Sequence, residues 1–201
     1  MNRSILGLMV LVIVTSLPTS ISSQTNLLLN PNADSNAENW RAFGQATVEE
    51  FNGDKVFVVR DGCSGGSHFL QDVNLDMSDV GKYALLIGRG SSERINADGA
   101  ITGLPYLYGY MMESVNPKGG TVRAYLQGQQ MRAVANQPDE WVAMYGIFRV
   151  PEGTVAISFF LQQAERKDIP QNGSAARFDN LGLYLFKTKA QALEFAKTYK
   201  Y

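Results

Sequence analysis

The sequence has almost none of the residues that form cross-links or bind soft metals. It contains one cysteine, Cys63, and one histidine, His68. A single cysteine excludes an intrachain disulfide, and one cysteine with one histidine cannot form the usual ligand set of zinc. The two residues lie five positions apart across a glycine-rich segment, with no third residue to orient a base. The pair therefore does not indicate catalysis, and Cys63 is expected to be buried, a free thiol or part of an intermolecular bridge.

The sequence also lacks an excess of charge of either sign. Its 18 lysines and arginines oppose 19 acidic residues, and the basic residues are scattered. A chain without a basic cluster has no electrostatic surface for nucleic acid or anionic lipid. We therefore expect neutral partners and no nucleic acid. A glycosylation sequon at Asn172 matters only in a eukaryotic source.

Long apolar runs are confined to the start of the chain. A short basic segment is followed by an apolar run over residues 5–17 and by a Ser/Thr-rich stretch that ends at Ser23. This is the layout of a secretory signal peptide, and the run is too short to span about 30 Å of hydrocarbon comfortably. The sequence predicts a signal peptide over 1–23, a secreted, periplasmic or extracellular location, and no membrane insertion after cleavage. An uncleaved anchor is the alternative.

Repeated helix patterns are missing from residues 24–187, which contain short β-prone runs separated by turn formers. Asn52-Gly53 between two such runs predicts a hairpin, and residues 83–88, apolar on both faces, predict a covered central strand. Residues 89–99 are expected to form a polar connection at the rim of a binding face. The pattern predicts an all-β fold, a two-sheet jelly-roll sandwich over 24–187. Only residues 188–201 indicate a short helical tail, either docked on the sandwich or frayed.

Alternating tyrosines are the most unusual local feature of the chain. A period of two places the tyrosines of residues 106–110 on one side of a strand, and a short turn leads to a strand over 121–127 with a polar and aromatic face. Such a set either forms a ligand platform or packs as aromatic residues commonly do in strands. The candidate ligand-binding residues are Tyr106, Tyr108, Tyr110, Arg123, Tyr125 and Gln127, with Arg89 at the rim.

Three segments frame the mature chain: residues 26–34 with Trp40 after them, residues 141–153, and residues 178–183. In order and spacing they resemble carbohydrate-binding modules of the galactose-binding-like jelly-roll group, of the family-four, family-nine and family-twenty-two type. Trp40 is expected to anchor the core under the first loop. We expect the opening segment to meet the closing strand, which would bring Asp34 near Asp179.

The resemblance implies both a ligand and a cofactor. Such modules bind sugars through aromatic rings that stack on the pyranose, while amides and guanidinium groups satisfy its hydroxyls. They also commonly hold a structural calcium, which prefers about six to eight oxygen ligands. Carried over to this sequence, the implied carboxylate ligands are Asp34, Asp54 and Asp179, with backbone oxygens near Asn32 and Lys55. Without a metal, Asp34 would cap its own loop and Asp179 would pair with Arg177 or a lysine.

The function predicted from the sequence is that of a secreted, non-catalytic module that binds a neutral glycan or a similar hydroxyl-rich ligand. One alternative is an exported adhesion or scaffold module that binds protein through the same face, with Cys63 in an intermolecular contact. Another is a small jelly-roll polysaccharide hydrolase or lyase, because a fold does not exclude grafted chemistry. Hydrolysis would require two carboxylates beside a cleft, and the candidates are Glu93, Asp98, Glu113 and Glu140.

Overall fold

The computed structural model describes residues 24–60, 66–95, 101–115, 122–132, 137–164 and 174–201. The predicted signal peptide, Cys63, Asp98 and Asn172 lie outside these residues. In the part of the chain that is described, no helix is long and apolar enough to cross a membrane.

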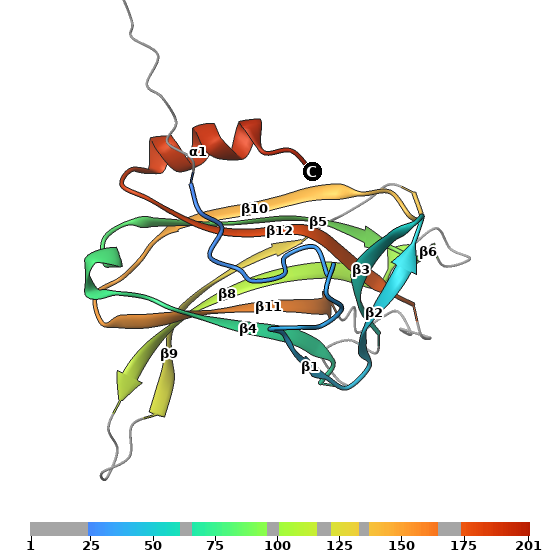
Figure 1. The fold of residues 1–201 in the computed structure, drawn as a ribbon, viewed down its shortest axis with the longest axis horizontal. Helices are drawn as coiled ribbons and strands as arrows, with labels where there is room; N and C mark the ends of the chain where they lie inside the picture. Colours follow the sequence, from blue (N-terminus) through green and yellow to red (C-terminus); the bar gives the residue numbers. More distant parts are fainter. Residues whose placement is uncertain (1–23, 61–65, 96–100, 116–121, 133–136, 165–173) are drawn as a thin grey trace, which may run out of the picture.

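Two five-stranded antiparallel sheets form the body of the protein (Figure 1). The first, here called the tyrosine sheet, has the order β1 (Arg41–Phe43), β4 (His68–Asn74), β11 (Thr154–Ala164), β8 (Leu104–Val115), β9 (Val122–Arg132). The second, here called the helix-covered sheet, has the order β10 (Val142–Arg149), β5 (Tyr83–Ser92), β12 (Ala176–Phe186), β3 (Asp54–Val59), β2 (Ala46–Phe51). A two-stranded ladder of β6 (Arg94–Ile95) and β7 (Ile101–Thr102), the 3-10 turn η1 (Met77–Asp79) and helix α1 (Lys189–Thr198) complete the described elements.

The core lies between the two sheets. Alternate residues of each strand enter it, as Phe159 of β11 and Phe178 of β12 do, and both are fully buried. Trp40 is 6% exposed and packs its ring 4.9 Å from Phe57 and 6.0 Å from Phe159. Its Nε1 donates to the carbonyl of Leu29 at 3.1 Å, so the buried indole keeps a polar partner. The prediction that Trp40 anchors the core is confirmed.

Helix α1 covers the outer face of the helix-covered sheet (Figure 1). Leu85 and Ile87 of β5 pack against Ala192 and Ala196 of the helix, while Leu86 between them enters the core between the sheets. The predicted central strand is therefore covered on both faces, and the tail is docked. A capping box at Thr188, whose hydroxyl accepts from the backbone N–H of Gln191, starts the helix.

The hairpin at Asn52-Gly53 is confirmed, but the rim connection is not. Phe51 and Asp54 are paired across a two-residue turn in which Asn52 and Gly53 both have positive φ, 53° and 91°, as a type I′ turn requires. The expected polar connection over 89–99 is wrong in its first part, because β5 continues to Ser92. In the ladder to β12, the backbone of residues 89–92 pairs with that of residues 176–179, and Ser92 is fully buried.

The opening segment meets the last strand, β12, as the sequence predicted. The opening segment forms no regular strand, but the N–H of Leu27 donates to Leu183 O at 2.9 Å and that of Leu181 donates to Pro31 O at 3.3 Å. The side chain of Asn26 adds three bonds: Nδ2 donates to Leu181 O at 2.9 Å, and Oδ1 accepts from Leu183 at 3.0 Å and from Leu28 at 3.1 Å. Asn26 therefore substitutes for strand pairing along β12.

We predict that Asn26→Ala destabilises the protein by about 2–3 kcal/mol, because a net contribution near 1 kcal/mol is lost for each of its hydrogen bonds. Chemical denaturation of the purified protein measures this change. Thr25→Ala, at an exposed neighbouring position, is the control and is expected to change stability by less than about 0.5 kcal/mol. Equal stabilities of the two variants would contradict the role given to Asn26.

Candidate functional site

The three tyrosines of β8 face away from the core. Leu107 and Met111 are fully buried between the sheets, and Gly109 lies directly against Leu86 of the opposite sheet. The residues that alternate with them therefore project from the outer face of the tyrosine sheet. Their rings stack in sequence, with centroids 5.5 Å apart for Tyr106 and Tyr108 and 5.6 Å apart for Tyr108 and Tyr110. Tyr106 is 6% exposed and lies under the guanidinium of Arg132, which is 4.6 Å from its ring.

The register of β11 brings further side chains beside the tyrosines. Phe160 lies opposite Tyr108 on one side and Leu70 of β4 on the other, and Ser158 lies between Tyr110 and Asp72. The Phe160 ring makes an edge contact with Tyr110 at 5.1 Å. His68 and Phe43 extend this aromatic band toward β1, with centroids 5.3 Å from His68 to Phe160 and 4.5 Å from Phe43 to His68.

An open hollow of about 650 Å³ lies on this face, and its lining is mostly apolar with one polar end. The lining residues are Arg41, Leu70, Asp72, Tyr110, Met112, Ser158 and Phe160. At the polar end, Arg41 Nη2 is 2.6 Å from Asp72 Oδ2, and Ser158 Oγ donates to Asp72 Oδ1 at 2.5 Å. An apolar floor with a few fixed polar groups is the usual construction of a small-molecule or sugar site.

The predicted residues of β9 are arranged differently from the tyrosines. β8 and β9 are neighbours as expected, but the ladder shifts register between Met111 and Met112. Gln127 lies opposite Met111, which points into the core, and is itself exposed. Arg123 and Tyr125 are opposite Ser114 and Met112, and only their backbone is described. The positions opposite Tyr106 and Tyr108 belong to Arg132 and Gln130.

Sequence reasoning missed Arg41, Asp72, Phe160 and Arg132, all from the outer face. The available signal was the period-two alternation of β4 and β11, in which Phe159 is a core residue and its neighbour Phe160 must then face outward. That signal gives a face for each side chain, whereas the grouping of the four residues depends on strand order. Strand order was not readable from the sequence.

Arg89 is not beside the tyrosines, because it lies on β5 of the other sheet. Its Nε and Nη2 both donate to Asp179 Oδ2, at 3.1 and 2.5 Å, and its guanidinium lies 4.6 Å from the ring centre of Trp141. Asp179 is 5% exposed, so this pair neutralises a buried carboxylate. The alternative partner considered for Asp179, Arg177, instead pairs with Asp139 at 2.6 Å.

The predicted calcium ligands Asp34, Asp54 and Asp179 line a separate, smaller hollow of about 180 Å³. Its lining residues are Asn32, Asp34, Asp54, Lys55, Arg89, Asp179 and Asn180. Carboxylate and amide oxygens are the donors that calcium prefers, so the donor chemistry fits. Two cations share the hollow, however, since Arg89 holds Asp179 and Lys55 Nζ lies 3.5 Å from the carbonyl oxygen of Asp34. Among the described residues, no three His, Cys, Asp or Glu side chains are close enough to form a metal site by themselves.

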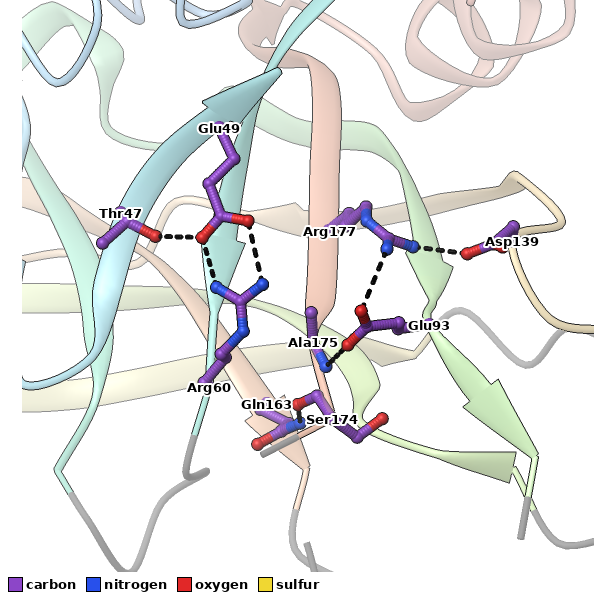
Figure 2. A network of polar contacts seen from close by, with 9 residues as sticks. All are labelled: Thr47, Glu49, Arg60, Glu93, Asp139, Gln163, Ser174, Ala175 and Arg177. Carbon is purple, nitrogen blue, oxygen red and sulfur yellow. Dashed lines mark hydrogen bonds and ion pairs between the residues drawn. The ribbon is translucent and has the colours of Figure 1, made fainter. Parts of the chain in front are cut away.

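Of the carboxylates considered for hydrolysis, Glu93 belongs to a polar network at the end of the helix-covered sheet (Figure 2). One of its oxygens accepts from the N–H of Ala175 at 3.0 Å, and the other lies 3.7 Å from Arg177. The same figure shows Arg60 bound through two nitrogens to Glu49. These hydrogen bonds from Arg60 hold the pKa of the Glu49 carboxyl below its ordinary value.

The fold is a two-sheet jelly-roll sandwich, of the kind found in carbohydrate-binding modules. This confirms the fold class and the resemblance predicted from the sequence. No family model matches the sequence, and no curated protein matches it.

Solved structures with the same fold can be compared directly. The enzymatically active domain of bacteriophage CBA120 tailspike protein 4 has a TM-score of 0.52 and 14% identity over 80% of this chain and 21% of that one. A candidate sugar-binding protein from Bacteroides thetaiotaomicron has a TM-score of 0.51 and 10% identity over 80% of this chain and 100% of that one. The tandem of two family-22 carbohydrate-binding modules from Paenibacillus barcinonensis Xyn10C has a TM-score of 0.50 and 12% identity over 80% of this chain and 50% of that one. The chain thus spans about a fifth of the tailspike chain. At these identities the likeness shows the shared fold.

We predict that Arg89→Gln destabilises the protein by about 2–4 kcal/mol, because it leaves the buried Asp179 carboxylate without its cation. Thermal or chemical unfolding measures the loss. Arg41→Gln is the matched control, since it breaks an ion pair whose arginine side chain is 57% exposed, and it is expected to cost less than about 1 kcal/mol. If both variants lost the same stability, Arg89 would not have the structural role assigned to it.

Proposed function

We propose that this protein is a secreted, non-catalytic module that binds a glycan whose main chain is neutral and rich in hydroxyls. The binding surface is the outer face of the tyrosine sheet. The observation that carries the proposal is the outward orientation of Tyr106, Tyr108 and Tyr110 beside Phe160, next to a hollow with a polar end. The shared fold with carbohydrate-binding modules supports it as an analogy of architecture.

The chemistry of this face suits a sugar ring. The apolar C–H face of a pyranose stacks on aromatic rings, and Phe160 and Tyr110 supply such rings in the hollow. Sugar hydroxyls require planar or fixed donors and acceptors, which Arg41, Asp72 and Ser158 present together at one end. The face combines both requirements within one hollow, whereas the helix-covered sheet has its outer face occupied by α1 and the network of Figure 2.

We predict that Phe160→Ala and Tyr110→Ala each weaken binding to the recognised polysaccharide by at least about tenfold, because each removes a stacking ring worth about 1.4 kcal/mol or more. A glycan array identifies the polysaccharide, and affinity electrophoresis or calorimetry measures the loss.

Tyr145→Ala is the matched control for these variants, because Tyr145 is an aromatic residue that is 50% exposed on β10 of the other sheet. It is expected to leave binding unchanged. No retardation on any polysaccharide would reject the glycan proposal and favour the protein-binding alternative. Release of sugar fragments by the wild-type protein would instead favour the hydrolase or lyase.

The second part of the proposal is a structural calcium at the smaller hollow. Asp34, Asp54, Asn32 and Asn180 would hold the ion, together with the carboxylate of Asp179. The ion would tie the opening segment to the last strand without a disulfide.

We predict that calcium raises the melting temperature by roughly 5–10 °C at a hundredfold excess over its dissociation constant, because a ligand at that excess contributes about 2.7 kcal/mol. Asp54→Asn abolishes this rise. Glu152→Gln, at an exposed turn away from the hollow, retains it. An unchanged melting temperature with calcium and with chelator would remove calcium as a stabilising ligand.

A further inference from the structure

The charged side chains that the structure describes on the outer face of the tyrosine sheet differ in balance from the sequence as a whole. The whole sequence has a net charge of −1. Among the described side chains on this face, two arginines, Arg41 and Arg132, accompany one acidic residue, Asp72. The carboxylate of Asp72 has both oxygens engaged, one by Arg41 and one by the hydroxyl of Ser158. Both oxygens of Asp72 therefore have a partner within the protein, and the three side chains together carry one more cation than anion.

Arg41 is placed to receive an anion. It lines the main hollow and also a neighbouring hollow of about 440 Å³, so it lies where the two meet. Its side chain is 57% exposed and makes one ion pair, through Nη2. Within the described part of the chain, no residue accepts a hydrogen bond from its Nε or Nη1. Asp72, which also accepts from Ser158, orients the guanidinium by holding one Nη2–H. The second Nη2–H and the neighbouring N–H on the other edge have the geometry that binds carboxylate or sulfate with two hydrogen bonds.

Arg132 lies at the opposite edge of the same sheet. Four strand intervals separate β1 from β9, which corresponds to roughly 19 Å at a spacing of about 4.8 Å. The Arg132 side chain is exposed over the ring of Tyr106, and the aromatic residues lie between the two arginines. A ligand that crosses the sheet would thus meet a cation at each edge and aromatic rings between them.

We propose that the glycan recognised by this face carries anionic groups, carboxylate or sulfate, and that Arg41 binds one of them. The inference rests on the proposed function, because it assigns the substituents of the same glycan whose neutral main chain stacks on Phe160 and Tyr110. It departs from the expectation of a wholly neutral ligand, which was based on the charge of the whole sequence. Binding of a charged ligand depends on the charges of the face that it contacts, and not on the net charge of the whole chain.

Pairs of polymers that share a main chain and differ in charge test the inference. Carboxymethyl dextran and dextran make one pair, and dextran sulfate and dextran make another. At about 50 mM salt we expect at least fivefold tighter binding to the acidic member of one pair, and the advantage shrinks as salt screens the charges. Tighter binding to the acidic polymer of only one pair would show whether the face recognises carboxylate or sulfate. Equal affinity for the acidic and neutral members of both pairs would overturn the inference while leaving the proposed function standing.

Substitution of Arg41 assigns the contact. Arg41→Gln lowers the acidic-to-neutral affinity ratio to about one. Arg41→Lys retains part of the ratio, because lysine keeps the positive charge but cannot form the two parallel hydrogen bonds of a guanidinium. Arg149→Gln removes an exposed arginine of β10 on the other sheet and leaves the ratio unchanged. The melting temperature of each variant confirms that it is folded. An unchanged ratio in folded Arg41→Gln would overturn the inference, and failure of the wild type to bind any polysaccharide of the glycan array would overturn the proposed function with it.

Discussion

The pairing of β11 with β4 on one side and β8 on the other determines both the core and the candidate site. Because successive residues of a strand point to opposite faces, one register places Phe159 in the core and Phe160 on the outer surface. The same register places Tyr110 on one side of Ser158 and Asp72 on the other. A slip of one residue would exchange the two faces and lose the core and the site together. The site is therefore as strongly specified as the core that it covers.

The two sheets have different roles. The outer face of the helix-covered sheet is occupied by α1 and by the polar network around Arg177, so its residues are used for stability (Figures 1 and 2). On the outer face of the tyrosine sheet, the residues that the structure describes line an open hollow. The closure of the chain ends through Asn26 also belongs to the helix-covered sheet, which leaves the open face unobstructed by that contact.

The two arginine–aspartate ion pairs differ in burial, and they differ in their structural role for that reason. Arg89 and Asp179 are largely enclosed, and the pair satisfies a carboxylate that would otherwise be costly to bury. Arg41 and Asp72 are exposed at the hollow, where such a pair adds little stability and instead fixes the direction of a guanidinium. From sequence alone these arginines were not distinguishable: Arg89 was expected at a binding rim, and no role was predicted for Arg41. Their partners come from strands distant in the chain, so only tertiary structure assigns them.

The sequence by itself determined the features that depend on local periodicity and turn chemistry. The Asn52-Gly53 hairpin, the buried Trp40, the doubly covered β5 and the common side of the three tyrosines were all predicted, because each follows from residues near one another in the chain. The tertiary structure decided which face of the sandwich the tyrosines occupy and which residues stand beside them. That outcome depends on strand order and on a register shift in β9, and both are set by packing between segments far apart in sequence.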